Sequence, residues 1–527
     1  MRSEIDAGDI QAIARTAFAS FKSARYLLLR IDNPAATRRW LRGLAPASLA
    51  EVYENSPTEN NTEIYQIALT ATGLCKLGIR EEILTQFSPE FVEGMASSEN
   101  RSRGLGDIGA NAPEHWEWGV GENEPHILLI LFSSADRGEA FAARMRDQLR
   151  DGGLSVILDH PDSDMGGHEP FGFVDGISQP SFDWDRARIP GTTADQEYTN
   201  LLALGELLLG YRNEYGLLTD RPLLATDEKN ANLLPPGPHD RRDLGRNGSY
   251  LVYRQLAQDV RLFWQWVAKA ASVSGITMDE LAQSMVGRDR AGRPLQDLNV
   301  DRSIPGVSAY NTGRNGFLFD TDPDGLTCPL GAHIRRANPR TGDTSGGRRG
   351  PLDRFLIMLG LTIRRDHRPT SSTLPWPRNT TVWPFIRSED DAVASARFHR
   401  ILRRGREYGE QLDRKAALDP TTPDPQAGLH FLCLNANIAR QFEFVQSAWI
   451  ASAQFAALTG EQDPLLGNRE PFPTTPIATP APTDGFSRPG ARPHCRHLTG
   501  LPQFIRVRGG AYFFLPGLAA LKWIASD

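Results

Sequence analysis

The segment ARYLLLRI, residues 24–31, decides the fold, because it has the length and apolar density of a buried strand. Apolar residues with helical spacing follow over residues 34–44, so the two segments form a strand–helix unit. A second unit of this kind consists of HILLILF, residues 126–132, and a helical pattern over residues 140–149. Strands that alternate with helices in this way predict a mixed sheet with helices on one face.

The second half of the chain repeats this order. SYLVYR, residues 249–254, is a further strand with an amphipathic helical pattern behind it, and residues 430–434 begin another such unit. We therefore predict two related α+β halves, residues 1–245 and residues 246–527. The basic, proline-punctuated stretch at residues 341–391 is predicted to be an insertion in the second half.

The composition excludes several classes of protein. Among 527 residues, 40% are hydrophobic and 23% charged, as is usual for a globular protein, and the net charge of -6 argues against nucleic acid as a partner. The four cysteines form no CxxC pair, which fits a reducing compartment better than a disulfide framework or a structural zinc site. Neither a signal peptide nor a membrane-spanning stretch is recognisable, so we expect a cytoplasmic protein with no membrane partner.

The run EPFGFVDGISQP, residues 169–180, places the carboxylate of Asp175 in an otherwise apolar segment. Gly172 and Gly176 allow the backbone a positive φ or a close approach to a ligand. An aspartate in such surroundings suits proton transfer, although a carboxylate in a tight turn can also serve only its own backbone. The apolar neighbours that would keep bulk water away are Phe171, Phe173, Val174 and Ile177.

Downstream, the run CPLGAHIRRANPR, residues 328–340, contains His333. An imidazole can ligate iron, zinc or copper, and a single histidine with no second one nearby suits an axial haem ligand better than a tetrahedral zinc site. A histidine with a purely structural role is the alternative.

The third motif is ILRRGREYG, residues 401–409, which contains Arg403 and Arg404. Paired arginines often form a solvated face. If one of them turns into a pocket with Asp175, its fixed charge would bind a polarised oxygen species and keep the carboxylate ionised.

Together these motifs resemble those of the dye-decolorizing peroxidases, a family of haem enzymes. GFVDG matches the family's GxxDG signature, CPLGAHIRRANPR its proximal-histidine segment, and ILRRGREYG the segment of its distal arginine. The resemblance extends over most of the chain and is best to the longer, insertion-bearing subgroup. It implies an α+β fold of two ferredoxin-like halves, with antiparallel sheets and helices packed on them, of the dimeric α+β barrel superfamily.

The resemblance also implies roles for individual residues. His333 would be the proximal iron ligand, Asp175 the distal acid/base and Arg403 the distal arginine, with Arg404 as the less favoured alternative. Glu407 stands where the family usually has a proline, which leaves the local turn open. Asp463 would hydrogen-bond the proximal imidazole. The other residues expected beside the cofactor are Phe173, Val174, Gly176, Ile177, Leu429 and Phe431, the last two of which also suit an ordinary strand core.

The function implied is that of a peroxidase with haem b (iron protoporphyrin IX), which reduces hydrogen peroxide and oxidises aromatic donors such as dyes or phenols. Bulky donors would pass electrons through surface Trp or Tyr residues. The sequence is also compatible with a homo-oligomer. A haem-binding or haem-delivery protein is the first alternative, although it has no need for Asp175 and Arg403. The second is a metal-binding module that uses His494, Cys495 and His497 of PHCRH.

Overall fold

The structure is a computed structural model. It describes residues 5–54, 62–186, 201–296, 314–319, 322–340, 395–469, 483–489 and 495–526. The insertion predicted at residues 341–391 lies outside the described residues.

Four strands of the N-terminal half lie side by side in the order β2-β3-β1-β4. Helix α1 (Pro34–Arg42) follows β1, and helix α7 (Gly138–Asp151) connects β3 to β4. The strand bounds are β1 (Ser23–Ile31), β2 (Glu63–Leu69), β3 (Ile127–Ser133) and β4 (Leu154–Pro161).

The C-terminal half repeats this arrangement with β10 and β11 beside β12, followed by β9 and β15. Helices α9 (Val260–Ser274) and α10 (Met278–Val286) follow β9, and two π-helical segments, Ala439–Glu443 and Val445–Ile450, follow β12. The strand bounds are β9 (Ser249–Gln258), β10 (Leu402–Arg403), β11 (Arg406–Gly409), β12 (Ala427–Asn435) and β15 (Ile505–Leu515).

The mixed sheet predicted from the alternation of strands and helices is wrong. Every neighbouring pair in the described main sheet is antiparallel. The reason is that each helical connection joins two strands that run in the same direction but are separated by a third. Thus β3 lies between β1 and β2, and β9 lies between β12 and β15. The alternation of strands and helices in the sequence shows which helix connects two strands. It does not show that a third strand lies between them.

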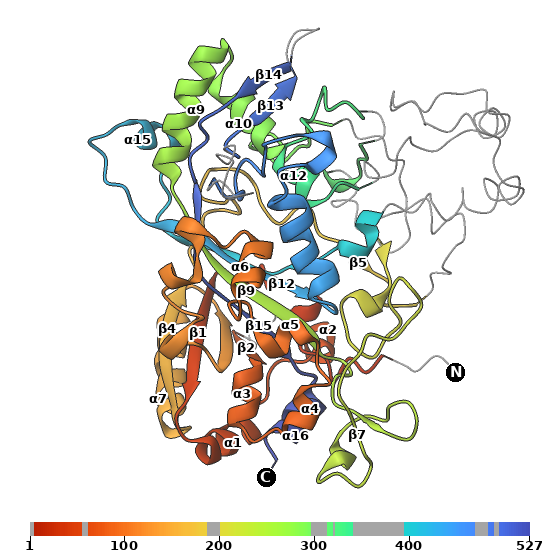
Figure 1. Ribbon diagram of the computed structural model, residues 1–527. Coiled ribbons are helices and arrows are strands. Elements are labelled where there is room, and N and C mark those ends of the chain that lie inside the picture. Colours follow the sequence, from red (N-terminus) through yellow and green to blue (C-terminus); the bar gives the residue numbers. More distant parts are fainter. Residues whose placement is uncertain are drawn as a thin grey trace, which may run out of the picture.

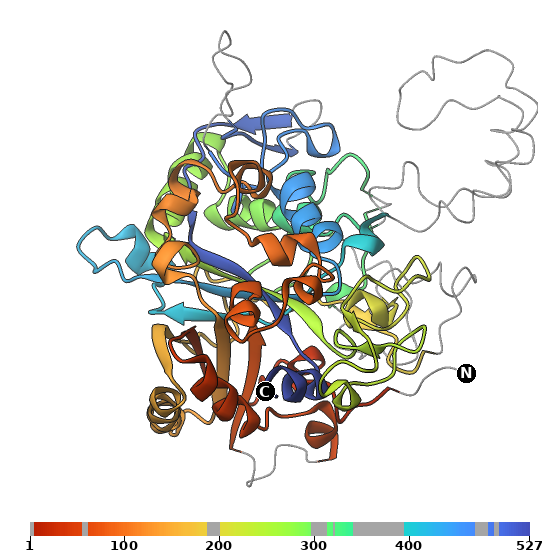
Figure 2. The same ribbon diagram turned by 60° about the horizontal axis from the view of Figure 1, so that its bottom comes forward.

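The α+β class is confirmed, and each half has the strand order of a ferredoxin-like unit, 2-3-1-4 along the sheet. Along the described chain, the two halves meet where β15 pairs with β2 through Phe514 and Leu69. The long neighbouring strands β9 and β15 therefore run through the middle of the molecule (Figures 1 and 2). The boundary near residue 245 stays a prediction, which this repeated order supports.

Local signals in the sequence start and stop the helices of the second half. Asp259 caps α9 by accepting from the N–H of Leu262, and Gly275 ends it in the left-handed conformation. A capping box of Thr277 and Glu280 begins α10. These caps hold two helices over the strand that forms one wall of the cavity described below.

Helices cover mainly one face of the sheet, where apolar residues of α1, α7, α9 and α10 pack against strand residues such as Leu29 and Val252. The N-terminal segment, residues 10–21, and residues 202–211 cover the other face, against Leu28 and Tyr253. Among the described residues, no helix has the length and apolar character needed to cross a membrane.

Phe514 is fully buried at the pairing of the two halves. We expect Phe514→Ala to lower the free energy of unfolding by about 3–5 kcal/mol, because it leaves a cavity where the halves meet. Chemical denaturation measures this. Val273→Ala, at a side chain that is 83% exposed, should change the free energy by less than about 0.5 kcal/mol. Equal effects of the two substitutions would contradict the packing described.

Candidate active site

A cavity of about 350 Å³ lies in the C-terminal half, against strands β9 and β12. Its other walls are the loop with Asp175, the short helix α12 (His333–Ala337) and the two π-helical segments. A cavity of this size is typical of a small-molecule or cofactor site. All of the site residues predicted from the sequence line it except Asp463, which lies behind His333.

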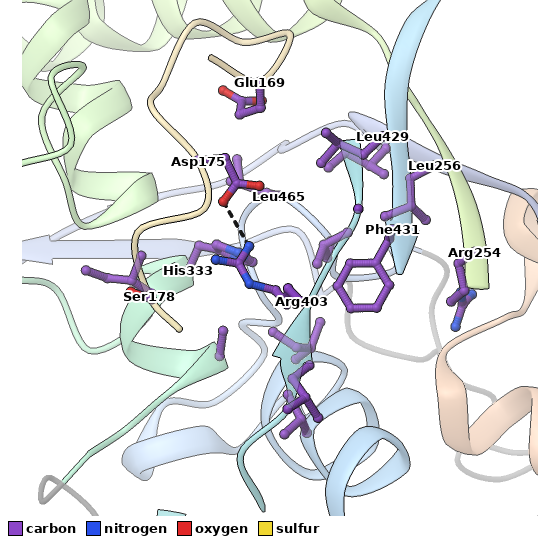
Figure 3. A pocket seen from close by; sticks show the side chains of 18 of the residues that line it. Glu169, Asp175, Ser178, Arg254, Leu256, His333, Arg403, Leu429, Phe431 and Leu465 are labelled. Atoms are coloured by element: carbon purple, nitrogen blue, oxygen red, sulfur yellow. Dashed lines mark hydrogen bonds and ion pairs between the residues drawn. The ribbon is translucent and has the colours of Figure 1, made fainter. Parts of the chain in front are cut away.

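The loop that carries Asp175 is shaped by its glycines and by Glu169. Gly172 and Gly176 have φ values of 91° and 76°, a region that favours glycine. The carboxylate of Glu169 accepts hydrogen bonds from the N–H groups of Phe171 at 3.0 Å and Phe173 at 2.9 Å. These bonds close the turn and direct the Asp175 side chain into the cavity (Figure 3).

Asp175 and Arg403 form an ion pair, with 2.8 Å between Oδ1 and Nη1 (Figure 3). Burial raises the pKa of Asp175, but the charge of Arg403 and hydrogen bonds to the carboxylate outweigh it, so the pKa lies below its ordinary value. The backbone N–H of Arg403 also donates to Gln179 at 3.0 Å, which ties β10 to the same loop. Asp175 is therefore an ionised base at neutral pH.

The structure separates the two neighbouring arginines. Arg404 turns away from the cavity and donates to the carbonyl groups of Ile13 at 2.9 Å and Arg15 at 3.0 Å. Successive side chains of an extended strand point to opposite faces, which explains why only Arg403 reaches Asp175.

His333 is the first residue of α12, and its Nδ1 lies 2.9 Å from Oδ2 of Asp463. Asp463 is fully buried, and its Oδ1 accepts from the N–H groups of Leu465 and Leu466, both at 2.9 Å. Burial would raise the pKa of Asp463, but His333 and these hydrogen bonds lower it. The carboxylate thus holds the Nδ1 proton, and no described residue bonds Nε2.

The apolar wall comes from β12, where Leu429 and Phe431 point into the cavity (Figure 3). His430, between them, points to the opposite face, where its Nδ1 lies 2.9 Å from the hydroxyl of Tyr253. The alternation of a strand therefore gives one apolar wall in front of the sheet and a buried polar contact behind it.

Two further carboxyl groups line the cavity, those of Glu169 and Glu407. Burial raises the pKa of each to about 7, and the nearby charge of Asp175 adds to the effect. Reasoning from the sequence gave neither residue a role. Glu407 is directly opposite Leu429 in the sheet and so faces the same side, a strand pairing that the sequence alone does not show.

Two further arginines line the cavity, and no role was predicted for either of them from the sequence. Arg288 donates to the hydroxyl of Ser178 at 2.9 Å, and Arg254 forms a buried ion pair with Asp107. Nothing in the local sequence marks either one, because their partners are distant in the chain.

The metal-binding module suggested by PHCRH is not tested, since His494 lies outside the described residues. His497 pairs with Glu461, at 3.2 Å between Nδ1 and Oε1. Over the described ranges, no group of three or more His, Cys, Asp or Glu side chains could hold a metal ion.

Comparison with known proteins finds several peroxidases. The chain is 28% identical over 477 residues to dye-decolorizing peroxidase msp1 of Mycetinis scorodonius, which covers 87% of this chain and 76% of that protein. It is 26% identical over 518 residues to multifunctional dye peroxidase DyP2 of an Amycolatopsis species, which covers 94% of this chain and 91% of that protein. No protein-family model matches the chain.

Among solved structures, a DyP-type peroxidase of Anabaena aligns with a TM-score of 0.66 and 22% identity, over 98% of this chain and 94% of that one. This likeness shows the fold, the α+β arrangement described above.

We expect Arg403→Leu to raise the pKa of Asp175 above its ordinary value of 3.8, because burial then acts without the opposing charge. In the unaltered protein, the stability from this pair is present above pH 3.8 and lost as the pH falls through the lowered pKa. NMR titration of carbon-13 labelled aspartate in the cofactor-free protein measures the shift. Arg404→Leu is the matched control and should leave Asp175 unchanged. A pKa of Asp175 that is the same in both variants would refute the electrostatic role of Arg403.

Proposed function

We infer that this chain belongs to the dye-decolorizing peroxidase family, and we propose that it reduces hydrogen peroxide with haem b while it oxidises aromatic donors such as dyes or phenols. One observation carries the proposal. An ionised carboxylate paired with a guanidinium group lines the same cavity as an imidazole whose Nδ1 is held by a second carboxylate. A homo-oligomeric state and a cytoplasmic location stay predictions from the sequence.

The residues present fit a haem. The bond from His333 to Asp463 fixes the imidazole and leaves Nε2 as the ligand atom, as is usual for metal-bound histidine. The cavity wall is largely apolar, and it includes Arg254, whose Nε and Nη1 have no hydrogen-bond partner in the part of the chain that the structure describes. That spare donor capacity suits a carboxylate substituent of the cofactor.

Bound there, haem b would supply the iron that takes up peroxide and the two-electron redox chemistry. The protein's part is proton transfer and charge stabilisation. Asp175, ionised at neutral pH, accepts the proton of one peroxide oxygen and returns it to the other, which leaves as water. The guanidinium of Arg403 is held 2.8 Å from Asp175. It stabilises the negative charge that develops on the peroxide oxygens while the proton is moved from one to the other.

Leu429 and Phe431 restrict the space beside this ion pair. An apolar wall excludes bulk water from the charges, which strengthens their interaction with peroxide. The same wall leaves little room for a bulky dye next to Asp175. Large donors therefore need another point of contact.

Tyr215 offers such a point, since it is the one exposed side chain among the Phe, Trp and Tyr residues whose burial the structure describes, at 56%. Its ring stacks on Phe398 with 4.6 Å between centroids. The next residue, His399, lines the cavity and stacks on Phe444 at 3.6 Å. We propose that bulky dyes give their electrons to Tyr215, and that the packed side chains of Phe398 and His399 are the short path over which the electron passes to the cavity without these rings being oxidised.

The first test is spectroscopic. The purified protein should show a Soret band, lose it in His333→Ala, and keep it in His497→Ala, because His333 lines the cavity and His497 does not. Asp175→Asn and Arg403→Leu should bind haem but react with peroxide about 10²–10⁴-fold more slowly, as expected when an acid/base group or a charge-stabilising group is lost. Stopped-flow absorbance measures these rates. Haem binding with unchanged rates in both variants would favour a haem carrier over a peroxidase.

The second test concerns donor size. Tyr215→Phe should lower the steady-state turnover of a bulky anthraquinone dye several-fold and leave that of a small phenol unchanged, because phenylalanine is much harder to oxidise. Leu217→Ala, at a residue that is 64% exposed on the same loop, is the control and should alter neither. If Tyr215→Phe turns over the large dye as the unaltered protein does, the route through this tyrosine is wrong.

A further inference from the structure

Glu407 lies at the edge of the sheet, between the cavity and the surface loop at residues 162–166. Its strand β11 pairs with β12 alone among the described strands. On the free side, the N–H of Ser163 donates to the carbonyl of Glu407 at 2.9 Å. The adjoining residue Asp164 is exposed, whereas the Glu407 side chain lines the cavity. Glu407 therefore stands between solvent and the proposed reaction site.

The carboxyl group of Glu407 accepts few hydrogen bonds. Within the described residues, only its own backbone N–H donates to it. Glu169, the other acid of the cavity wall, differs, because its oxygens accept from two backbone N–H groups and from the side chain of Gln258 at 2.8 Å. Of the two, Glu407 is thus the group that can turn and exchange a proton.

The charges around Glu407 favour its protonated form near neutrality. Asp175 and Glu169 face it from the loop over the cavity, and burial together with these negative charges raises its pKa to about 7. Arg406, on its own strand, opposes this shift but is paired with Asp162 at 2.9 Å. From β12, the nearest titratable group is His430, which burial keeps neutral with a pKa of about 3. The β9 residues that line the cavity near this edge, Leu256 and Gln258, carry no charge.

We propose that Glu407 is a proton-exchange residue, which carries protons from the surface loop at residues 162–166 to the Asp175–Arg403 pair. This inference rests on the proposed peroxidase function. Reduction of one hydrogen peroxide to two waters consumes two electrons, which the aromatic donor supplies, and two protons. Asp175 only moves a proton between the two oxygens, so the two consumed protons must come from elsewhere. Glu407 gives its carboxyl proton to the cavity and takes another from water at the surface.

The first measurement does not depend on turnover. Infrared titration of the protein should show carboxylic acid absorption that disappears as the pH rises through about 7. Glu407→Gln should remove part of this absorption. Glu410→Gln, at an exposed acid three residues further on, should leave it intact. Full absorption in Glu407→Gln would overturn the proposal.

The second measurement is the pH profile of steady-state turnover in the haem-loaded enzyme. Glu407→Gln should be about 10–100-fold slower at pH 6, because glutamine has no proton to give. Glu407→Asp, or added formic acid as a small proton carrier, should restore much of the rate. Unchanged turnover of Glu407→Gln at pH 6 would overturn the role in proton exchange. A loss of turnover that neither the Glu407→Asp substitution nor formic acid reverses would overturn it too. If the unaltered protein binds no haem or turns over no peroxide, it is the peroxidase proposal that fails, and the infrared titration still decides whether Glu407 holds a proton.

Discussion

The ion pair between Asp175 and Arg403 is the interaction on which the site depends. It joins residues 228 positions apart, one on a glycine-shaped loop and the other on the short strand β10. Without the guanidinium, burial would favour the neutral acid, which could not accept a proton. The β10–β12 pairing and the bond from Arg403 to Gln179 serve to bring these two groups together. The strand pairing in the second half thus positions Arg403 for its contact with Asp175.

The opposite side of the cavity follows the same physical logic. Asp463 is 130 positions from His333, fully buried, and stabilised by two backbone N–H groups, so it remains ionised beside the imidazole. In both pairs a carboxylate inside the protein, half-buried for Asp175 and fully buried for Asp463, keeps its charge because a distant part of the chain supplies the compensating group. Glu169 and Glu407 line the same cavity without a cation of their own, which is why burial moves their pKa values toward neutrality.

Much of this could be predicted from the sequence, because apolar runs mark buried strands and the three motifs carry most of the chemistry. The motifs predict Asp175, His333 and Arg403 as site residues, and the structure brings them to one cavity. The antiparallel sheet could not be predicted from spacing, since that requires knowing which strand is inserted between two others. The ion pair of Arg254 with Asp107 was equally hidden, because the partner lies 147 positions away.

The position of β15 has a consequence for biosynthesis. Ile505 and Val507 line the cavity, and β15 is the neighbour of β9 in the centre of the sheet. A ribosome releases these residues long after β9 and the loop with Asp175 have emerged. The edge of β9 that pairs with β15 therefore stays open while nearly 250 further residues, from Gln258 to Ile505, are made. The cavity can close only once β15 has been made, and until then the open edge of β9 is a surface that has to be shielded from aggregation.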